Sequence, residues 1–183
     1  MYKVYQKIIL ACLLLVMTGT VYSQRVTQTI NDGWKFSLFE GDASTADFDI
    51  SGWTDVSIPH TWNAKDADDE IPGYFRGKGW YRKVVTVEEL IPEQRVYLSF
   101  EGANQETNVF VNGTFVGNHK GGYSAFTFDV TDYVHAGRNL IAVSVDNSHH
   151  PDIAPLSADF TFFGGIYRDV YLVYTSPVQL STT

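Results

Sequence analysis

The sequence contains a single cysteine, Cys12, among its 183 residues. Cys12 lies within an apolar run, residues 8–17, which follows two lysines and leads into a segment that ends at Ser23. This arrangement predicts a secretory signal peptide over residues 1–23. Cleavage there would leave no cysteine, so the exported domain must be held together by its hydrophobic core without disulfides.

The chain also lacks a long hydrophobic segment. A membrane-spanning helix needs roughly 20 apolar residues, and the run at residues 8–17 has about half that number. A retained membrane anchor, the competing interpretation of the N-terminus, is disfavoured by this length. Cys12 lies inside the run rather than after it, which argues against a lipoprotein signal. We therefore expect an exported protein, periplasmic or secreted, with no membrane partner after cleavage.

Basic residues are scarce, with 13 Lys and Arg against 21 Asp and Glu. Removal of residues 1–23 takes away Lys3 and Lys7, which leaves 11 basic residues against 21 acidic ones and a net charge of −10. A field of this sign repels phosphate backbones and anionic lipids, so nucleic acid is not expected as a partner. Neutral ligands such as sugars stay compatible, an acidic substrate is weakly disfavoured, and we expect no cofactor.

The pattern of alternating helices and strands typical of α/β proteins is absent, whereas short alternating runs are frequent. The clearest lies in residues 109–130, where Asn112 and Gly113 separate two runs of Val, Thr and Phe. Asn-Gly tolerates positive φ at both positions, as a two-residue type I′ turn requires, so a β-hairpin is predicted. Beyond it, glycines flank a polar loop around His119, and residues 126–128 alternate as a strand.

Eight or nine short strands are expected in total, with one helical turn over residues 130–134 and a polar lead-in at residues 24–30. Outside the hairpin and the strand that follows it, the strands are expected at residues 34–38, 56–58, 80–87, 96–100, 139–146 and 167–174. Such a series predicts an all-β, antiparallel fold. A β-sandwich of jelly-roll type is the best single description.

Two segments of 19 residues each, 60–78 and 147–165, have no helical or strand period. Segments of this length without an element are usually functional or disordered, and their aromatic residues favour ordered, functional loops.

Polar residues in these loops raise two possible chemical sites. The acidic cluster at residues 66–70 has no nearby apolar residue to raise a carboxyl pKa and no calcium-loop spacing, so a solvated loop is favoured over a catalytic pair or a calcium site. His149 and His150, with Asp152 and Asp159, lack an informative metal-ligand spacing, and ordinary loop polarity is the better interpretation. We expect no catalytic residue and no metal site.

Four segments carry a family pattern. They are IPHTW at 58–62 leading to GWYRK at 79–83, VNGTFVGNHKGGYSAFTFDVT at 111–131, GRNL at 137–140 leading to VDN at 145–147, and GGIYRDV at 164–170. In order and spacing they resemble the N-terminal sugar-binding domain of glycoside hydrolase family 2, the β-galactosidase and β-glucuronidase group. The resemblance implies a galactose-binding-like jelly roll over residues 24–178, with residues 179–183 as a tail leading to the next domain.

In that family an immunoglobulin-like domain and a catalytic TIM barrel with two glutamates follow the jelly roll. The resemblance therefore implies a non-catalytic domain of an exported hydrolase, one that completes the barrel's pocket for a β-linked glycan and has little activity alone. The alternative is a free-standing carbohydrate-binding module or lectin on the same fold.

The resemblance also implies substrate-binding residues. Asp159 matches an aspartate that contacts a sugar hydroxyl in family β-galactosidases; a turn-capping role is the alternative. Asn63 is a weaker candidate, because Asp66 could take its place. Trp62 could stack on a sugar ring or pack against a neighbouring domain. His119, next to the Gly-Gly-Tyr segment, is the fourth candidate.

Overall fold

The computed structural model describes residues 25–66, 73–154, 156–157 and 160–176. Ten strands and one 3-10 helix lie in this part of the chain. They are β1 (Arg25–Thr29), β2 (Trp34–Leu38), β3 (Thr54–Val56), β4 (Lys78–Val87), β5 (Arg95–Phe100), β6 (Glu106–Val111), β7 (Thr114–Lys120), β8 (Phe126–Asp129), η1 (Thr131–Tyr133), β9 (Gly137–Asp146) and β10 (Val170–Thr175). The predicted signal peptide and tail lie outside the described residues.

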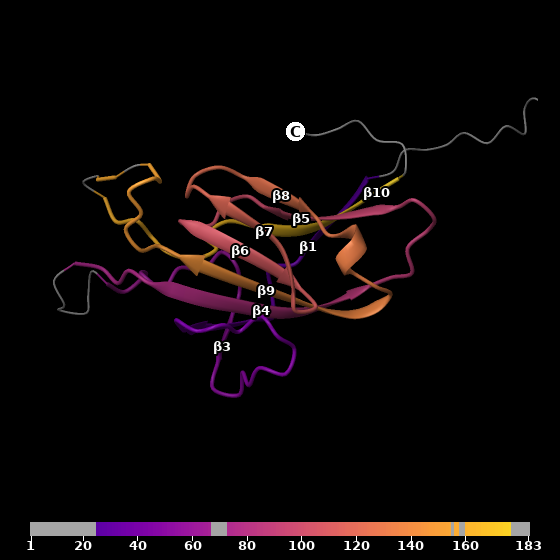
Figure 1. Ribbon diagram of the computed structural model, residues 1–183, viewed down its shortest axis with the longest axis horizontal. Coiled ribbons are helices and arrows are strands. Elements are labelled where there is room, and N and C mark those ends of the chain that lie inside the picture. Colours follow the sequence, from indigo (N-terminus) through magenta and orange to yellow (C-terminus); the bar gives the residue numbers. More distant parts are fainter. Residues whose placement is uncertain (1–24, 67–72, 155, 158–159, 177–183) are drawn as a thin grey trace, which may run out of the picture.

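The strands form two antiparallel sheets that pack face to face (Figure 1). The four-stranded sheet has the order β1-β10-β5-β8, and the six-stranded sheet has the order β3-β2-β4-β9-β6-β7. The predicted all-β antiparallel sandwich is therefore confirmed, while the jelly-roll topology stays a prediction. The described residues contain no helix long and apolar enough to cross a membrane.

The main core lies between the two sheets. Along β6 the residues alternate, so that Thr107, Val109 and Val111 are buried against the opposite sheet. Trp34 and Tyr81 are fully buried and meet edge to face, with ring centroids 6.4 Å apart. Each large side chain buried in this way stabilises the fold by roughly 2–3 kcal/mol, which explains how a chain without disulfides holds its shape.

A second, smaller cluster lies on the outer face of the six-stranded sheet. The segment between β2 and β3 folds over this face and buries Ala43 against Trp80 and Ala142. The Arg82 side chain, also on the outer face, donates from Nη1 to the Ala43 carbonyl at 3.1 Å. Part of the six-stranded sheet is thus covered on both faces.

The hairpin predicted at Asn112 and Gly113 is confirmed, since their φ values are +51° and +81°. Several of the predicted boundaries are wrong. The strand expected at residues 56–58 is β3, Thr54–Val56, so residues 57 and 58 lie outside it. Residues 25–29, expected as a lead-in, form strand β1, because they pair with β10 although their side chains are exposed. The last strand begins at Val170 rather than Tyr167.

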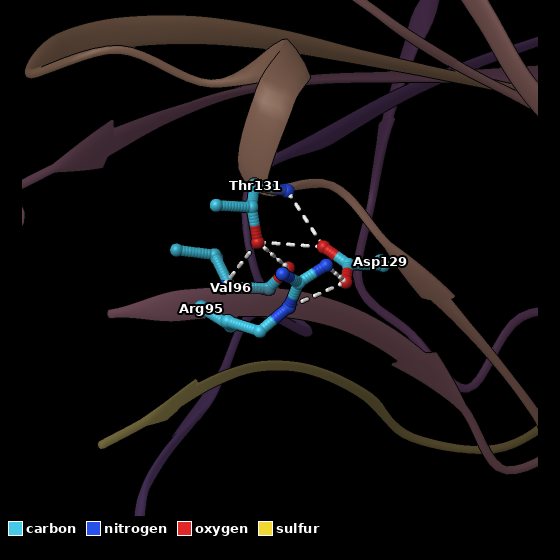
Figure 2. A network of polar contacts seen from close by, with 4 residues as sticks. All are labelled: Arg95, Val96, Asp129 and Thr131. Atoms are coloured by element: carbon cyan, nitrogen blue, oxygen red, sulfur yellow. Dashed lines mark hydrogen bonds and ion pairs between the residues drawn. The ribbon is translucent and has the colours of Figure 1, made fainter. Parts of the chain in front are cut away.

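A polar network joins β5 to the turn after β8 (Figure 2). Asp129 accepts a hydrogen bond from Arg95 Nε at 2.8 Å and others from the Thr131 hydroxyl at 2.6 Å and the Thr131 N–H at 3.0 Å. The Thr131 hydroxyl in turn accepts from the Val96 N–H at 3.0 Å. The network fixes the start of η1 against the edge of the four-stranded sheet.

Candidate functional site

The long irregular loops gather at one end of the sandwich, which we call the loop end. There β4 begins, β9 ends, and β6 pairs with both β9 and β7 through Glu106. The described segments at this end are 60–66, 73–77, 101–105, 121–125 and 147–169, without residues 155, 158 and 159. In Figure 1 the magenta loop before β4 and the gold loop before β10 both project from this end, away from the last part of β10.

Asn63 is buried, with 2% of its surface exposed, and it joins the loops of this end. Its Nδ2 donates to Asp66 Oδ2 at 2.7 Å and to the Phe75 carbonyl at 2.8 Å. Its Oδ1 accepts from the Gly164 N–H at 2.6 Å and from Asn147 Nδ2 at 3.3 Å. The amide proposed from the sequence as a substrate contact therefore has all its hydrogen-bonding capacity used by the protein.

Asn147 completes this arrangement from the residue directly after β9. Its Oδ1 accepts from the Gly77 N–H at 2.8 Å, and its Nδ2 donates to the carbonyls of Phe75 at 3.2 Å and Phe162 at 3.0 Å. In the sequence, Asn147 was recognised only as part of the family segment at residues 145–147, and its role in joining the two loops was not predicted. The available signal was a single Asn at the junction between a long strand and an irregular loop, where unpaired backbone groups need side-chain partners.

Trp62 lies within the loop end and packs against the protein itself. Its ring stacks on Phe36 with centroids 5.8 Å apart and an interplanar angle of 12°. Gly164 and Gly79 lie against the ring edge, since a Cβ at these positions would be 2.1 Å and 2.7 Å from Trp62 atoms. The Trp62 Nε1 atom is buried and has no hydrogen-bond partner among the described residues. Trp62 thus occupies a close-fitting site between loop and sheet.

His60 and Tyr81 form a hydrogen bond of 2.8 Å beneath these loops. Burial raises the pKa of the Tyr81 hydroxyl, although a hydrogen bond from the Ile166 backbone opposes the shift. Burial also lowers the pKa of His60. The Tyr81 hydroxyl, which keeps its proton, can donate it to Nδ1 of a neutral His60 imidazole whose own proton lies on Nε2.

His119 was expected in a loop, and this is wrong: β7 continues through it to Lys120. The ring lies flat on Phe126, with centroids 4.1 Å apart, and Nε2 lies 3.4 Å from the Ser124 hydroxyl. Burial lowers the pKa of His119, against an opposing backbone hydrogen bond at Gly121. His119 is therefore a half-buried, uncharged imidazole near the end of β7, where this strand reaches the loop end.

The exposed surface of the loop end carries aromatic rings. Phe75, Tyr123, Phe160 and Phe163 are all exposed large side chains on its loops. Flat aromatic faces suit the C–H surface of a pyranose ring or a neighbouring apolar surface.

Hydrogen bonds hold these aromatic loops together. Asn104 Nδ2 donates to the Phe163 carbonyl at 2.8 Å, and the backbones of Asn104 and Gly165 form a β-bridge. The Tyr167 hydroxyl donates to the Gly122 carbonyl. The loop between β7 and β8 is therefore fixed to the segment before β10.

The remaining candidates from the sequence are the acidic and histidine residues of the two loops. Asp159 lies outside the described residues. Asp66 accepts from Asn63 and from the Phe75 N–H, both at 2.7 Å, which gives its carboxylate a structural use. His150 Nε2 lies 3.3 Å from a carboxylate oxygen of Glu106. Among the described residues no group of three or more His, Cys, Asp or Glu side chains could hold a metal ion.

A groove lies at the other end of the sandwich, between the β4–β5 connection and β1 and β10. Its volume is about 600 Å³, and its apolar residues are Val26, Leu90, Ile91 and Tyr174. The polar lining consists of Gln28, Thr86, Glu88, Glu89 and Gln94. Tyr174 is the penultimate residue of β10, so the groove adjoins the point where the chain leaves the sandwich.

A two-sheet sandwich that presents aromatic and amide-rich loops at one end belongs to the class of β-sandwich domains whose loops serve binding. The family model described as "Glycosyl hydrolases family 2, sugar binding domain" matches residues 27–177. The chain belongs to this family, which confirms the resemblance inferred from its motifs.

Curated relatives and solved structures agree with this assignment. A putative beta-glucuronidase of Formosa agariphila is 37% identical over 174 residues, which are 92% of this chain and 21% of the relative. A beta-galactosidase of Thermoanaerobacter pseudethanolicus is 41% identical over 157 residues, 80% of this chain and 19% of the relative. The structure of Bacteroides uniformis beta-glucuronidase 2, covalently bound to cyclophellitol-6-carboxylate aziridine, superimposes with a TM-score of 0.76 and 47% identity, covering 82% of this chain and 18% of that one. The chain thus spans about a fifth of the length of these relatives.

Proposed function

We propose that this chain is the non-catalytic, N-terminal sugar-binding domain of an exported family 2 glycoside hydrolase, and that its loop end forms one wall of a pocket for a β-linked glycan. The observation that carries the proposal is the set of hydrogen bonds from Asn63 and Asn147, which holds the described parts of two irregular loops, the one before β4 and the one after β9, in one arrangement. Because these loops are already held in place, little conformational entropy is lost when a ligand binds to their exposed rings.

The glycan is a galactoside or a glucuronide, as the names of the relatives suggest. Asp159 contacts a sugar hydroxyl, as the family resemblance implies. Asn63 and Trp62 act on the ligand through the loops that they position, because their contacts are with the protein. His119 stands at the edge of the site with its ring against Phe126.

The catalytic groups belong to a following domain, which sits on the groove lined by Val26, Leu90, Ile91 and Tyr174. Support comes from the share of the relatives' length that this chain spans and from the position of the groove beside the end of β10. Residues 1–23 direct the protein out of the cytoplasm as a cleaved signal peptide.

The test is calorimetric titration of the purified chain with methyl β-galactoside and methyl β-glucuronide, combined with a hydrolysis assay on the p-nitrophenyl analogues. We expect no hydrolysis above buffer, and weak binding that is lost in Asp159→Ala but kept in Asp152→Ala, a change of an exposed aspartate in the same loop. Hydrolysis by the chain alone would overturn the non-catalytic role. Binding that survives Asp159→Ala would remove that residue from the site.

A further inference from the structure

The outer face of the six-stranded sheet is covered by the β2–β3 segment on one side, but it is open over β6 and β7. Phe115 on β7 has 51% of its surface exposed, and Asn118 and Lys120 on the same strand are also exposed. On β6 the outward positions are Glu106, Asn108 and Phe110, because the residues between them face the core.

Polar side chains form a hydrogen-bonded row across three strands of this open face. Asn108 Nδ2 donates to the hydroxyl of Ser144 on β9 at 3.4 Å. Asn118 Nδ2 donates to Asn108 Oδ1 at 2.9 Å and to Glu106 Oε1 at 3.0 Å. Lys120 Nζ lies 3.7 Å from the same carboxylate oxygen. We call Glu106, Asn108, Asn118, Lys120 and Ser144 the outer-face cluster.

The outer-face cluster keeps hydrogen-bonding capacity that faces solvent. Asn118 Nδ2 uses both hydrogens within the protein, whereas its Oδ1 receives no hydrogen bond from the described residues. Lys120 has three ammonium hydrogens and one carboxylate neighbour, and Asn108 Nδ2 has a second hydrogen. Donors and acceptors therefore alternate over a few ångströms, in positions fixed by one another, which matches neighbouring hydroxyl groups.

The charges of the outer-face cluster nearly balance. Glu106 contributes one negative charge and Lys120 one positive charge. His150, on the loop after β9, also faces the Glu106 carboxylate at 3.3 Å. A local field without excess charge of either sign suits an uncharged ligand rather than a phosphate or a uronate.

An aromatic row borders this cluster. Trp80, Phe110 and Phe115 lie side by side across β4, β6 and β7, with ring centroids 5.7 Å and 5.4 Å apart. Trp80 is buried and Phe115 is the exposed end of the row. An exposed ring beside a row of amides offers a sugar both an apolar face and hydroxyl partners.

We propose that the outer face of β6 and β7 is a second glycan-binding surface, on which Phe115 stacks on a neutral sugar while Asn108, Asn118 and Lys120 bind its hydroxyls. This surface lies on the flank of the sandwich, on a sheet face that does not include the loop-end aromatic residues, so it would engage a further part of a long chain or a separate glycan.

The test is a site-resolved NMR titration of the chain with cellotetraose, a neutral β-linked tetrasaccharide, and with its C6-oxidised form. Cellotetraose should shift the side-chain amide signals of Asn108 and Asn118, and the oxidised form should bind more weakly. Loss of the stacking ring in Phe115→Ala should weaken binding roughly threefold to tenfold. Asn118→Asp, which keeps the side-chain shape but places a second carboxylate beside Glu106, should also weaken it.

Phe75→Ala is the matched control, because it removes an exposed ring from the loop end. It should leave the shifts at Asn108 and Asn118 unchanged. Amide signals that do not move up to about 10 mM cellotetraose, where millimolar binding would be visible, would overturn the proposal. Equal affinity in Phe115→Ala, Asn118→Asp and the parent chain would also overturn it.

Discussion

Asn147 Nδ2 donates to Asn63 Oδ1 at 3.3 Å, across 84 residues of sequence. The two amides lie beside each other because one follows the end of β9 and the other lies in the loop that leads to β4, the neighbouring strand. Between them they bind backbone groups of four further loop residues, Phe75, Gly77, Phe162 and Gly164. This pair therefore sets the shape of the surface to which we assign sugar binding.

Replacement of Asn147 should destabilise the whole domain. Asn147→Ala leaves the buried Gly77 N–H and the Phe162 carbonyl without their side-chain partner, whereas the Phe75 carbonyl keeps its hydrogen bond from Asn63. We expect a loss of about 2–4 kcal/mol in the free energy of unfolding, measured in urea. Ser99→Ala, which removes an exposed hydroxyl contact, should cost less than about 0.5 kcal/mol. Equal effects of the two changes would contradict a structural role for Asn147.

The close fit of Trp62 predicts a strong effect of one added methyl group. Gly164→Ala would place a Cβ 2.1 Å from the Trp62 ring, whereas a Cβ at Gly52 meets nothing within 4 Å. Overpacking of this kind costs roughly 1–3 kcal/mol. Gly52→Ala should stay within about 0.5 kcal/mol of the parent. Thermal unfolding of both variants measures the difference, and the same stability for Gly164→Ala as for the parent would show that Trp62 is loosely packed.

The His60–Tyr81 hydrogen bond predicts a dependence of stability on pH. Burial holds the pKa of His60 below its value in the unfolded chain, about 6.5. The contribution of the neutral imidazole is therefore complete above pH 6.5 and is lost as the pH falls through the lower, folded pKa. Unfolding free energies measured between pH 8 and pH 5 should decline on the acidic side.

His60→Asn isolates this contribution, because the Asn Oδ1 can still accept from the Tyr81 hydroxyl but does not titrate in this range. The variant should lose less stability than the parent between pH 7 and pH 5. His119, whose pKa burial also lowers, should sustain part of the decline in the variant. Parallel pH profiles for parent and variant would refute the assignment to His60.

Asp129 should matter more than its ion-pair partner. Burial raises the pKa of Asp129, but hydrogen bonds from Thr131 and Arg95 outweigh it and lower the pKa. Asp129→Ala removes both the Thr131 bonds and the ion pair, and it should cost about 1–2 kcal/mol. Arg95→Ala should cost less, because the guanidinium is exposed to solvent. A larger loss for Arg95→Ala in urea unfolding would reverse this interpretation.

The strands were largely predictable because local signals and tertiary structure agree. Asn112 and Gly113 specify the hairpin turn, and the alternation from residue 139 to residue 146 specifies a strand. Most of this strand is buried on both faces, because the segment between β2 and β3 covers part of the outer one. Residues 25–29 were missed because their strand exists through pairing with β10 rather than through a buried face. An edge strand with polar side chains has no period that a single sequence reveals.

The loop end was predictable in composition but not in geometry. Asn63 and Trp62 were selected as ligand contacts. In the structure both contact Gly164, which lies about a hundred positions further along the sequence. Such pairs depend on loop conformations that no local propensity encodes. For the same reason His119 was placed in a loop, since Gly117 and Gly121 suggested turns where β7 continues to Lys120.

The most direct test of the account is a domain exchange in a related enzyme. The beta-glucuronidase of Bacteroides fragilis is 37% identical to this chain over 172 residues. Its matching segment would be deleted, or replaced by residues 25–176 of this chain, and kcat/KM measured on p-nitrophenyl β-glucuronide. We predict that deletion abolishes activity, that exchange restores it measurably, and that Asp159→Ala in the exchanged domain lowers kcat/KM at least about tenfold while Asp152→Ala does not. Full activity without the domain would contradict the claim that this domain completes the sugar pocket. An unchanged kcat/KM in the exchanged enzyme that carries Asp159→Ala would contradict it as well.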